Sequence, residues 1–214
     1  MLLKFGTVVL SQAGEKVGEL ESVILDPATE EITHLIVKKG FLLSKNKMVP
    51  ISLVADSNDQ RIKLHEFEGE FDDLQDYQET YFIPVDNYIN KEVDGKIIPL
   101  LFYPPNPITT THAAHPASVP VVKENLATDK ESLEEGMDVV ALDNRKVGGV
   151  KEVILHPTTD RVTHLLVSKG LLFKHQFLIP SEWIKGINES AVHLYVDSKV
   201  IEKLPDYKHE GILT

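Results

Sequence analysis

The chain carries nearly the same nine residues twice: "ITHLIVKKG" from Ile32 to Gly40 and "VTHLLVSKG" from Val162 to Gly170, 130 positions apart. The same offset aligns "VILDP" with "VILHP" and the closing "LQDY" with "LPDY". The alignment runs without a gap from residue 6 to residue 77. Self-similarity of this length indicates that one supersecondary unit occurs twice, with about 72 residues in each copy.

The differences between the copies indicate where the backbone turns. Gly14 is replaced by Asn144, and these two residue types tolerate a positive φ best, so both copies are predicted to turn tightly there. The next turn holds Pro27 or Pro157 and joins two runs rich in β-branched residues, which is typical of a hairpin. The other positions predicted to shape turns or strand ends are Gly18, Gly148, Gly40, Gly170, Pro50 and Pro180.

Each copy is therefore predicted to fold as a small β-barrel. The pattern gives five or six short antiparallel strands in about 70 residues, and closure into a barrel removes exposed strand edges. Single helical turns are expected after Pro50 and Pro180, and a short amphipathic helix is expected at the end of each copy.

The predicted fold is all-β, with two barrels in tandem. The first barrel spans residues 1–77 and the second spans residues 134–214. Residues 78–133 have no counterpart in the repeat and contain the Pro-rich run "YPPNPITTTHAAHPASVP". We expect a linker that docks on a barrel in part over 78–103, for example as an added strand, and is extended over 104–133.

The repeated motif (I/V)THL(I/L)VxKG, the following strand ending in Pro, and the closing L(P/Q)DY resemble the PRC-barrel family. This resemblance covers residues 6–77 and 136–207. It implies an all-β barrel with a non-catalytic role in docking and assembly. The family includes the cytoplasmic barrel of the photosynthetic reaction-centre H subunit, which acts on electron and proton transfer. A ribosome-maturation factor that binds a ribosomal protein is another member.

Composition excludes several classes of function. The 214 residues have a net charge of −11, with acids in excess in every part of the chain, so we expect no binding to nucleic acid. The chain has no cysteine, and its longest apolar run, Ile97 to Tyr103, is too short to span a membrane. No basic and apolar leader is present at the start, so a cytoplasmic protein without an integral membrane segment is expected.

Strand alternation identifies a candidate interface. Leu35 and Val37 recur as Leu165 and Val167, which favours their face as the barrel interior. The opposite face would then carry further apolar residues and a histidine, and soluble proteins normally cover such a patch or use it for binding. The candidate interface residues are Ile32, His34, Ile36, Val162, His164 and Leu166. We expect the two patches to pack together about an approximate two-fold axis, within one chain or in a homodimer.

The histidines allow two interpretations. His34 and His164 could form a pH-sensitive interface, or each imidazole could be bonded to a neighbouring backbone group. His112 and His115 in "HAAH" have a spacing that suits a metal, but no third ligand is evident, so no metal or other cofactor is expected.

No enzyme signature is present: the chain lacks a Gly-rich phosphate loop, a G-x-S-x-G elbow and an HExxH helix. The sequence therefore predicts a non-enzymatic module for protein–protein interaction and assembly, with an unidentified protein partner. Two alternatives stay open. One is a peripheral H-subunit-like regulator of electron or proton transfer at a photosynthetic or respiratory membrane complex. The other is a sensor with a small ligand bound between the barrels, which would require a large apolar pocket.

Overall fold

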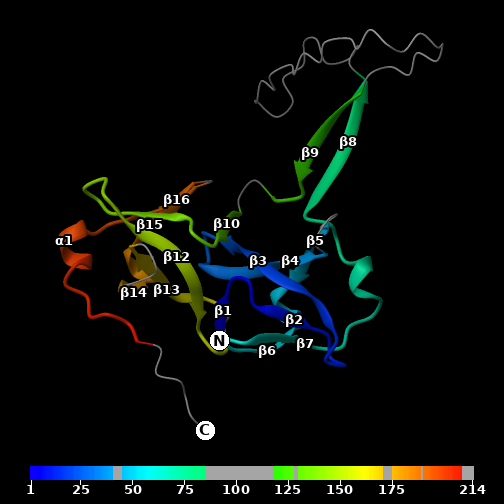
Figure 1. Ribbon diagram of the computed structural model, residues 1–214, viewed down its shortest axis with the longest axis horizontal. Helices are drawn as coiled ribbons and strands as arrows, with labels where there is room; N and C mark the ends of the chain where they lie inside the picture. The colour runs from blue at the N-terminus through cyan, green and yellow to red at the C-terminus, as the bar shows by residue number, and fades with distance from the viewer. Residues whose placement is uncertain (41–44, 85–117, 128–129, 171–174, 189, 209–214) are drawn as a thin grey trace. The chain divides into compact units, whose positions relative to one another are not determined.

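The computed structural model describes residues 1–40, 45–84, 118–127, 130–170, 175–188 and 190–208. Contacts divide the chain into two units: residues 1–77 with 126–214, and residues 78–125. In the smaller unit, β8 (Gln78–Pro84) pairs antiparallel with β9 (Ser118–Glu124) as a two-stranded ribbon (Figure 1). Residues 118–124 thus form a strand, where the sequence had predicted an extended linker. The predicted docking of 78–103 falls largely on residues outside the described ranges.

The first repeat forms one six-strand path, in the order β5-β4-β3-β2-β7-β6. Its strands are β2 (Val8–Leu10), β3 (Lys16–Asp26), β4 (Glu31–Lys39), β5 (Lys45–Pro50), β6 (Val54–Ser57) and β7 (Arg61–Leu64). Two 3-10 turns follow β5 and β7: η1 (Ile51–Leu53) and η2 (Phe71–Asp73). We call these elements barrel 1.

The second repeat forms the same path, in the order β14-β13-β12-β11-β16-β15. Its strands are β11 (Asp138–Val140), β12 (Lys146–Leu155), β13 (Val162–Lys169), β14 (His175–Pro180), β15 (Ile184–Ile187) and β16 (Ala191–Leu194). A 3-10 turn, η4 (Ser181–Trp183), and a short helix, α1 (Ser198–Ile201), complete it. We call these elements barrel 2. The all-β tandem fold predicted from the sequence is confirmed, but β2–β7 and β11–β16 pair parallel rather than antiparallel.

In each barrel, a glycine lies where the two strands of the central hairpin are too close for a side chain. A Cβ on Gly18 would lie 2.6 Å from the Lys38 carbonyl oxygen, and one on Gly148 would lie 2.5 Å from the Ser168 carbonyl oxygen. Only glycine fits such a distance. The other repeated turn positions also have their expected conformation, since φ is positive at Gly14, Asn144, Gly40 and Gly170.

Each repeat gives its first strand to the other barrel. β1 (Leu2–Lys4) pairs with β12 of the second repeat, and Leu3 lies opposite Val153. β10 (Glu131–Glu134) pairs with β3 of the first repeat, and Leu133 lies opposite Val23. The two exchanges are equivalent under the offset of 130, so they form a reciprocal pair about a local two-fold axis. An added strand thus joins barrel 1, and it comes from residues 131–134, of which 131–133 had been assigned to the extended linker and 134 to the second barrel.

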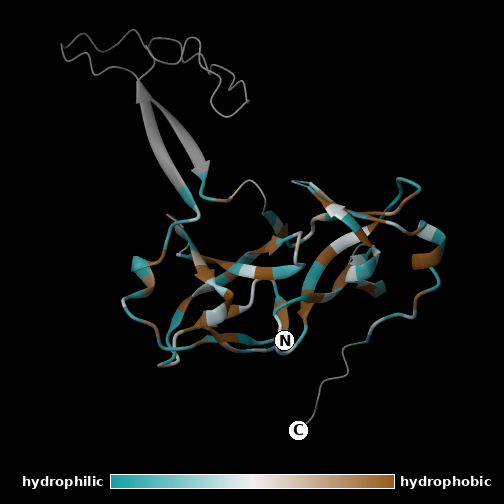
Figure 2. Cartoon of the chain, turned by 180° about the vertical axis from the view of Figure 1, so that it is seen from behind, coloured by the Kyte–Doolittle hydropathy of each residue, from teal (hydrophilic) through white to brown (hydrophobic). Residues whose placement is uncertain are grey.

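One hydrophobic core runs through both barrels. The exchanged residues Leu3 and Leu133 are fully buried in the same cluster as Val23, Val153 and the interior residues of both repeats. Figure 2 shows brown apolar residues alternating with teal polar ones along the strands of both repeats. The ranges 1–77 and 134–214 therefore describe the repeats along the chain, but each barrel also contains a strand from outside its own range. Among the described residues, no helix has the length and apolar character needed to cross a membrane.

Candidate interaction surfaces

The two barrels meet at the first residues of β4 and β13, the strands that carry the repeated motif of residues 32–40 and 162–170. We call this contact the seam. Glu31 pairs with Arg161, its own equivalent in the second repeat, so the local two-fold axis passes between them. Beside this bridge the Ile32 amide donates to the Asp160 carbonyl at 3.0 Å, and the Val162 amide donates to the Glu30 carbonyl at 2.9 Å. Such a contact of equivalent residues is the geometry of an isologous dimer, formed here within one chain.

Ion pairs flank the seam. Arg161 lies 3.2 Å from the Glu30 carboxylate, although both side chains are about half exposed. Lys130, just before β10, binds Asp26 at 2.7 Å. This hydrogen bond is the main reason that the pKa of Asp26 lies below its usual value. The half-exposed Arg161–Glu30 pair contributes little free energy, so the exchanged strands, the shared core and the less exposed Lys130–Asp26 pair hold the seam.

The structure separates the six candidate interface residues into two groups. Ile32 and Val162 are buried in the shared core, whereas Ile36 packs on the other face of β4 with Ile24, Met48 and Tyr77. The prediction that Ile32 and Ile36 share a face is wrong. The pairing of β3 with β4 shifts register between His34 and Ile32, and this β-bulge at Thr33 switches the face.

The second repeat has the same irregularity. The pairing of β12 with β13 shifts between His164 and Val162, and Leu166 lies opposite Glu152, outside the shared-core cluster. The apolar patches that contain Ile36 and Leu166 are therefore distinct from the seam. Ile36 is covered within barrel 1, chiefly by Tyr77 from the closing "LQDY".

The two histidines are partly buried and lie opposite prolines. His34 pairs with Pro50 and His164 pairs with Pro180, where β5 and β14 end. The Nδ1 atom of His34 lies 3.1 Å from the hydroxyl oxygen of Thr33. Burial lowers the pKa of His34, so the neutral imidazole is favoured in the folded chain. A side-chain partner thus takes the place of the backbone group that the sequence interpretation allowed.

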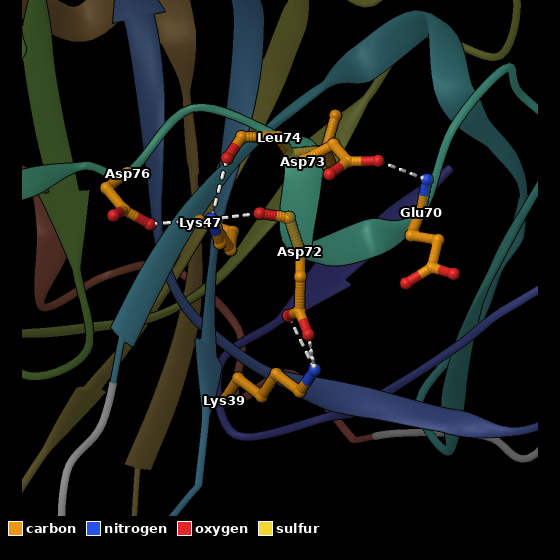
Figure 3. Close-up of polar contacts among 7 residues, drawn as sticks. All are labelled: Lys39, Lys47, Glu70, Asp72, Asp73, Leu74 and Asp76. Atoms are coloured by element: carbon orange, nitrogen blue, oxygen red, sulfur yellow. Dashed lines mark hydrogen bonds and ion pairs between the residues drawn. The ribbon is translucent and has the colours of Figure 1, made fainter.

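Lys47 is a buried charged residue, 5% exposed, and its contacts explain the closing motif (Figure 3). Its ammonium donates to the carbonyl oxygens of Asp72 at 2.6 Å and Leu74 at 2.8 Å, and it pairs with the Asp76 carboxylate at 2.7 Å. With three donors and three acceptors, the ammonium is fully used. Lys47 therefore clamps the segment that carries Tyr77.

Barrel 2 closes differently. Phe177 stands at the position of Lys47 and is buried in the shared core with Ile201 of α1. Asp206 instead contacts His175 at 3.0 Å on the surface, and the Tyr207 amide donates to the Gln176 carbonyl at 2.7 Å. Because Phe177 replaces Lys47, the closing segment of barrel 2 has no equivalent of the lysine clamp of barrel 1. No sequence signal had identified either cluster.

Three large apolar side chains are strongly exposed in the described part of the chain, and all belong to barrel 2. They are Leu142 (52% exposed), Tyr195 (58%) and Val200 (43%), which we call the end patch. The Leu142 amide donates to the carbonyl of Val196, the neighbour of Tyr195. The Ser198 hydroxyl donates to Asp143 at 2.7 Å, and this bond lowers the pKa of Asp143. The three residues thus sit on adjoining backbone segments.

The repeat shows that these exposed residues are not needed by the fold. The equivalent positions in barrel 1 hold Gln12, His65 and Glu70, which are polar and exposed. The tight turn after Gln12 and the strand that ends before His65 exist in both barrels, so the scaffold accepts polar residues at the positions of Leu142 and Tyr195; Val200 lies in α1, which barrel 1 replaces by η2. Sequence reasoning could have found the end patch by comparing the copies at positions that differ in polarity.

A cavity of about 290 Å³ lies where β10 meets barrel 1. It is lined mainly by carboxylates, from Glu19, Glu21, Glu134 and Glu135. A site for a small organic ligand is usually apolar with few polar groups, so this cavity does not match the expectation for a sensor. The described residues contain no group of three or more side chains suited to a metal. His112 and His115 lie outside the described residues.

A family model matches the chain twice, over residues 5–71 and 135–200, and its description is the PRC-barrel domain. The chain belongs to the PRC-barrel family. The two matches correspond to the two repeats and leave residues 72–134 between them, where the β8–β9 ribbon and β10 lie. No curated protein sequence matches the chain.

Proposed function

We propose that this PRC-barrel protein is a non-enzymatic interaction and assembly module, which binds a protein partner through the end patch of barrel 2. The observation that carries the proposal is the exposure of Leu142, Tyr195 and Val200 at positions that are polar in barrel 1. Large apolar side chains that are exposed on adjoining segments of a folded domain favour a binding site there. Tyrosine also favours interfaces, because it offers a large contact area and a polar tip.

The scaffold supports this role. Reciprocal exchange of β1 and β10 and the shared core hold the two barrels together, so barrel 2 presents its end patch from a fixed framework. Asp143 fixes the start of α1 through Ser198, which places Val200 relative to Leu142. A surface that is ordered before binding loses less conformational entropy on association.

The test replaces the end patch by its own barrel 1 counterpart. The triple variant Leu142→Gln, Tyr195→His and Val200→Glu should fold with little change in stability, because each residue is exposed. We expect tagged wild-type protein to retain a partner from the native cell that the triple variant loses. The control variant carries Gln12→Asn, His65→Gln and Glu70→Asp in barrel 1 and should retain that partner.

The identity of the partner separates the remaining alternatives. Subunits of a membrane electron-transfer complex, retained by wild type and lost by the triple variant, would favour the H-subunit-like regulator. Soluble proteins with the same behaviour would favour a general assembly role. An identical set of retained proteins for wild type and triple variant would contradict binding through the end patch.

A further inference from the structure

A second apolar surface lies on the face of barrel 2 that is turned away from the shared core. Strand register places Leu2 of β1 beside Ile154 of β12, and Leu166 of β13 beside Leu178 of β14. Tyr207 is hydrogen-bonded to Gln176 along the edge of β14. Leu166 is buried, whereas Leu2, Ile154, Leu178 and Tyr207 are each partly exposed. We call these five residues the outer face of barrel 2.

The equivalent face of barrel 1 is covered by other residues of the chain. Ile24, Ile36, Met48 and Tyr77 are all buried there as a separate cluster. Leu126, which precedes the exchanged strand β10, packs against this cluster. It lies between β9 and β10, in backbone without helical structure. A loop segment with one leucine thus packs against this face of barrel 1, on the cluster that contains Tyr77.

The outer face of barrel 2 is less covered than its counterpart in barrel 1, and it holds a buried carboxylate, Glu152, where barrel 1 has Ser22. Ile154 and Leu178 keep some exposure where their counterparts Ile24 and Met48 are buried. Leu2 stands at the position of Ser132, which is polar. Tyr207 is also more exposed than Tyr77, whose segment is clamped by Lys47. The outer face of barrel 2 is only partly covered, whereas its equivalent in barrel 1 is covered by a leucine. We therefore infer the group that would cover barrel 2 from the one that covers barrel 1.

We propose that the outer face of barrel 2 binds a leucine-bearing segment of a partner protein, in the way that barrel 1 holds Leu126. The expected contact is a leucine side chain against Ile154, Leu166 and Leu178, the counterparts of Ile24, Ile36 and Met48, with Leu2 beside Ile154 at one border and Tyr207 at the other. This surface uses none of the end-patch residues, so the inference goes beyond the function proposed above and stands or falls independently of it.

The probe is a synthetic peptide, Lys-Glu-Asn-Leu-Ala-Thr-Asp, which copies residues 123–129 and carries a spin label at its N-terminus. It is added to the full chain with isotope-labelled Ile, Leu and Met methyl groups. We expect paramagnetic broadening of Ile154, Leu166 and Leu178. A peptide with serine in place of leucine should bind at least about tenfold more weakly, since burial of the leucine side chain drives the contact.

The matched protein variants are Leu2→Ser and Leu142→Gln. Leu2→Ser introduces the residue that barrel 1 has at this position, and we expect peptide binding to weaken severalfold while the methyl spectrum stays dispersed. Leu142→Gln, in the end patch, should leave binding unchanged. Three results would overturn the proposal: no broadening, broadening of Ile24, Ile36 and Met48 in place of barrel 2, or equal binding by the Leu2→Ser variant.

Discussion

Replacement of the buried leucine of an exchanged strand by alanine should destabilise the barrel that the opposite repeat forms. Leu3 is fully buried, and its strand pairs only with β12. Leu3→Ala removes a buried leucine from a core that can collapse only in part, which costs about 3 kcal/mol. For a chain of this size, that loss lowers the midpoint of thermal unfolding by about 6–12 °C. Leu133→Ala should have a similar effect, because Leu133 has the equivalent position beside β3.

The location of the damage distinguishes exchange from independent barrels. Amide NMR spectra of Leu3→Ala should change most along β12 of the second repeat, and those of Leu133→Ala most along β3 of the first. The neighbouring change Leu2→Ala is the control. Leu2 is only partly buried, so its loss should cost less than half as much. Changes confined to β2 and β3 in Leu3→Ala would refute the exchange. So would separation of the two halves, without denaturant, after cleavage at a protease site engineered into residues 85–117.

Three further predictions concern single positions. Lys47→Met should lower the free energy of unfolding, measured by chemical denaturation, by about 2–4 kcal/mol, because it leaves a carboxylate and two carbonyls without their donor. The control Lys39→Met breaks an exposed pair with Asp72 and should cost under about 1 kcal/mol. Equal losses in the two variants would contradict the clamp. Gly148→Ala should lower the thermal midpoint far more than Gly186→Ala, since a Cβ at Gly186 meets nothing within 4 Å; similar midpoints would contradict the close strand approach. Burial lowers the pKa of His34 from 6.5, so the unfolded chain takes up the proton first as pH falls. The free energy of unfolding should therefore decrease below about pH 6.5, and it should decrease less in His34→Gln. Parallel pH profiles of the two proteins would exclude His34 as a cause.

Much of the fold follows from the repeat in the sequence. The substitution of Gly14 by Asn144 predicts a turn with positive φ, and both residues have it. The alternating pattern around Leu35 and Leu165 predicts strands with that face inward, and both residues are fully buried in the core. These features depend on local backbone preferences and side-chain period, which the sequence records directly.

The candidate interface could be predicted only in part. An apolar second face on β4 was visible in the sequence, but the bulge at Thr33 moves Ile32 into the shared core and leaves Ile36 on the opposite side. A bulge adds one residue to one strand, and the pattern of apolar residues around His34 does not reveal it. The cover of Ile36 by Tyr77 also joins residues that are distant in the chain.

The sequence by itself determined that this protein is one small β-barrel used twice, because two aligned copies share the strand pattern that buries Leu35 and Leu165 alike. Only the tertiary structure decided which barrel receives each first strand. The backbone hydrogen bonds of β1 are the same whether it pairs with β3 or with β12, and Leu3 and Leu133 are both leucines, so neither residue type encodes the choice. The exchange joins the two repeats into one core, because Leu3 and Leu133 are each buried among residues of the opposite repeat.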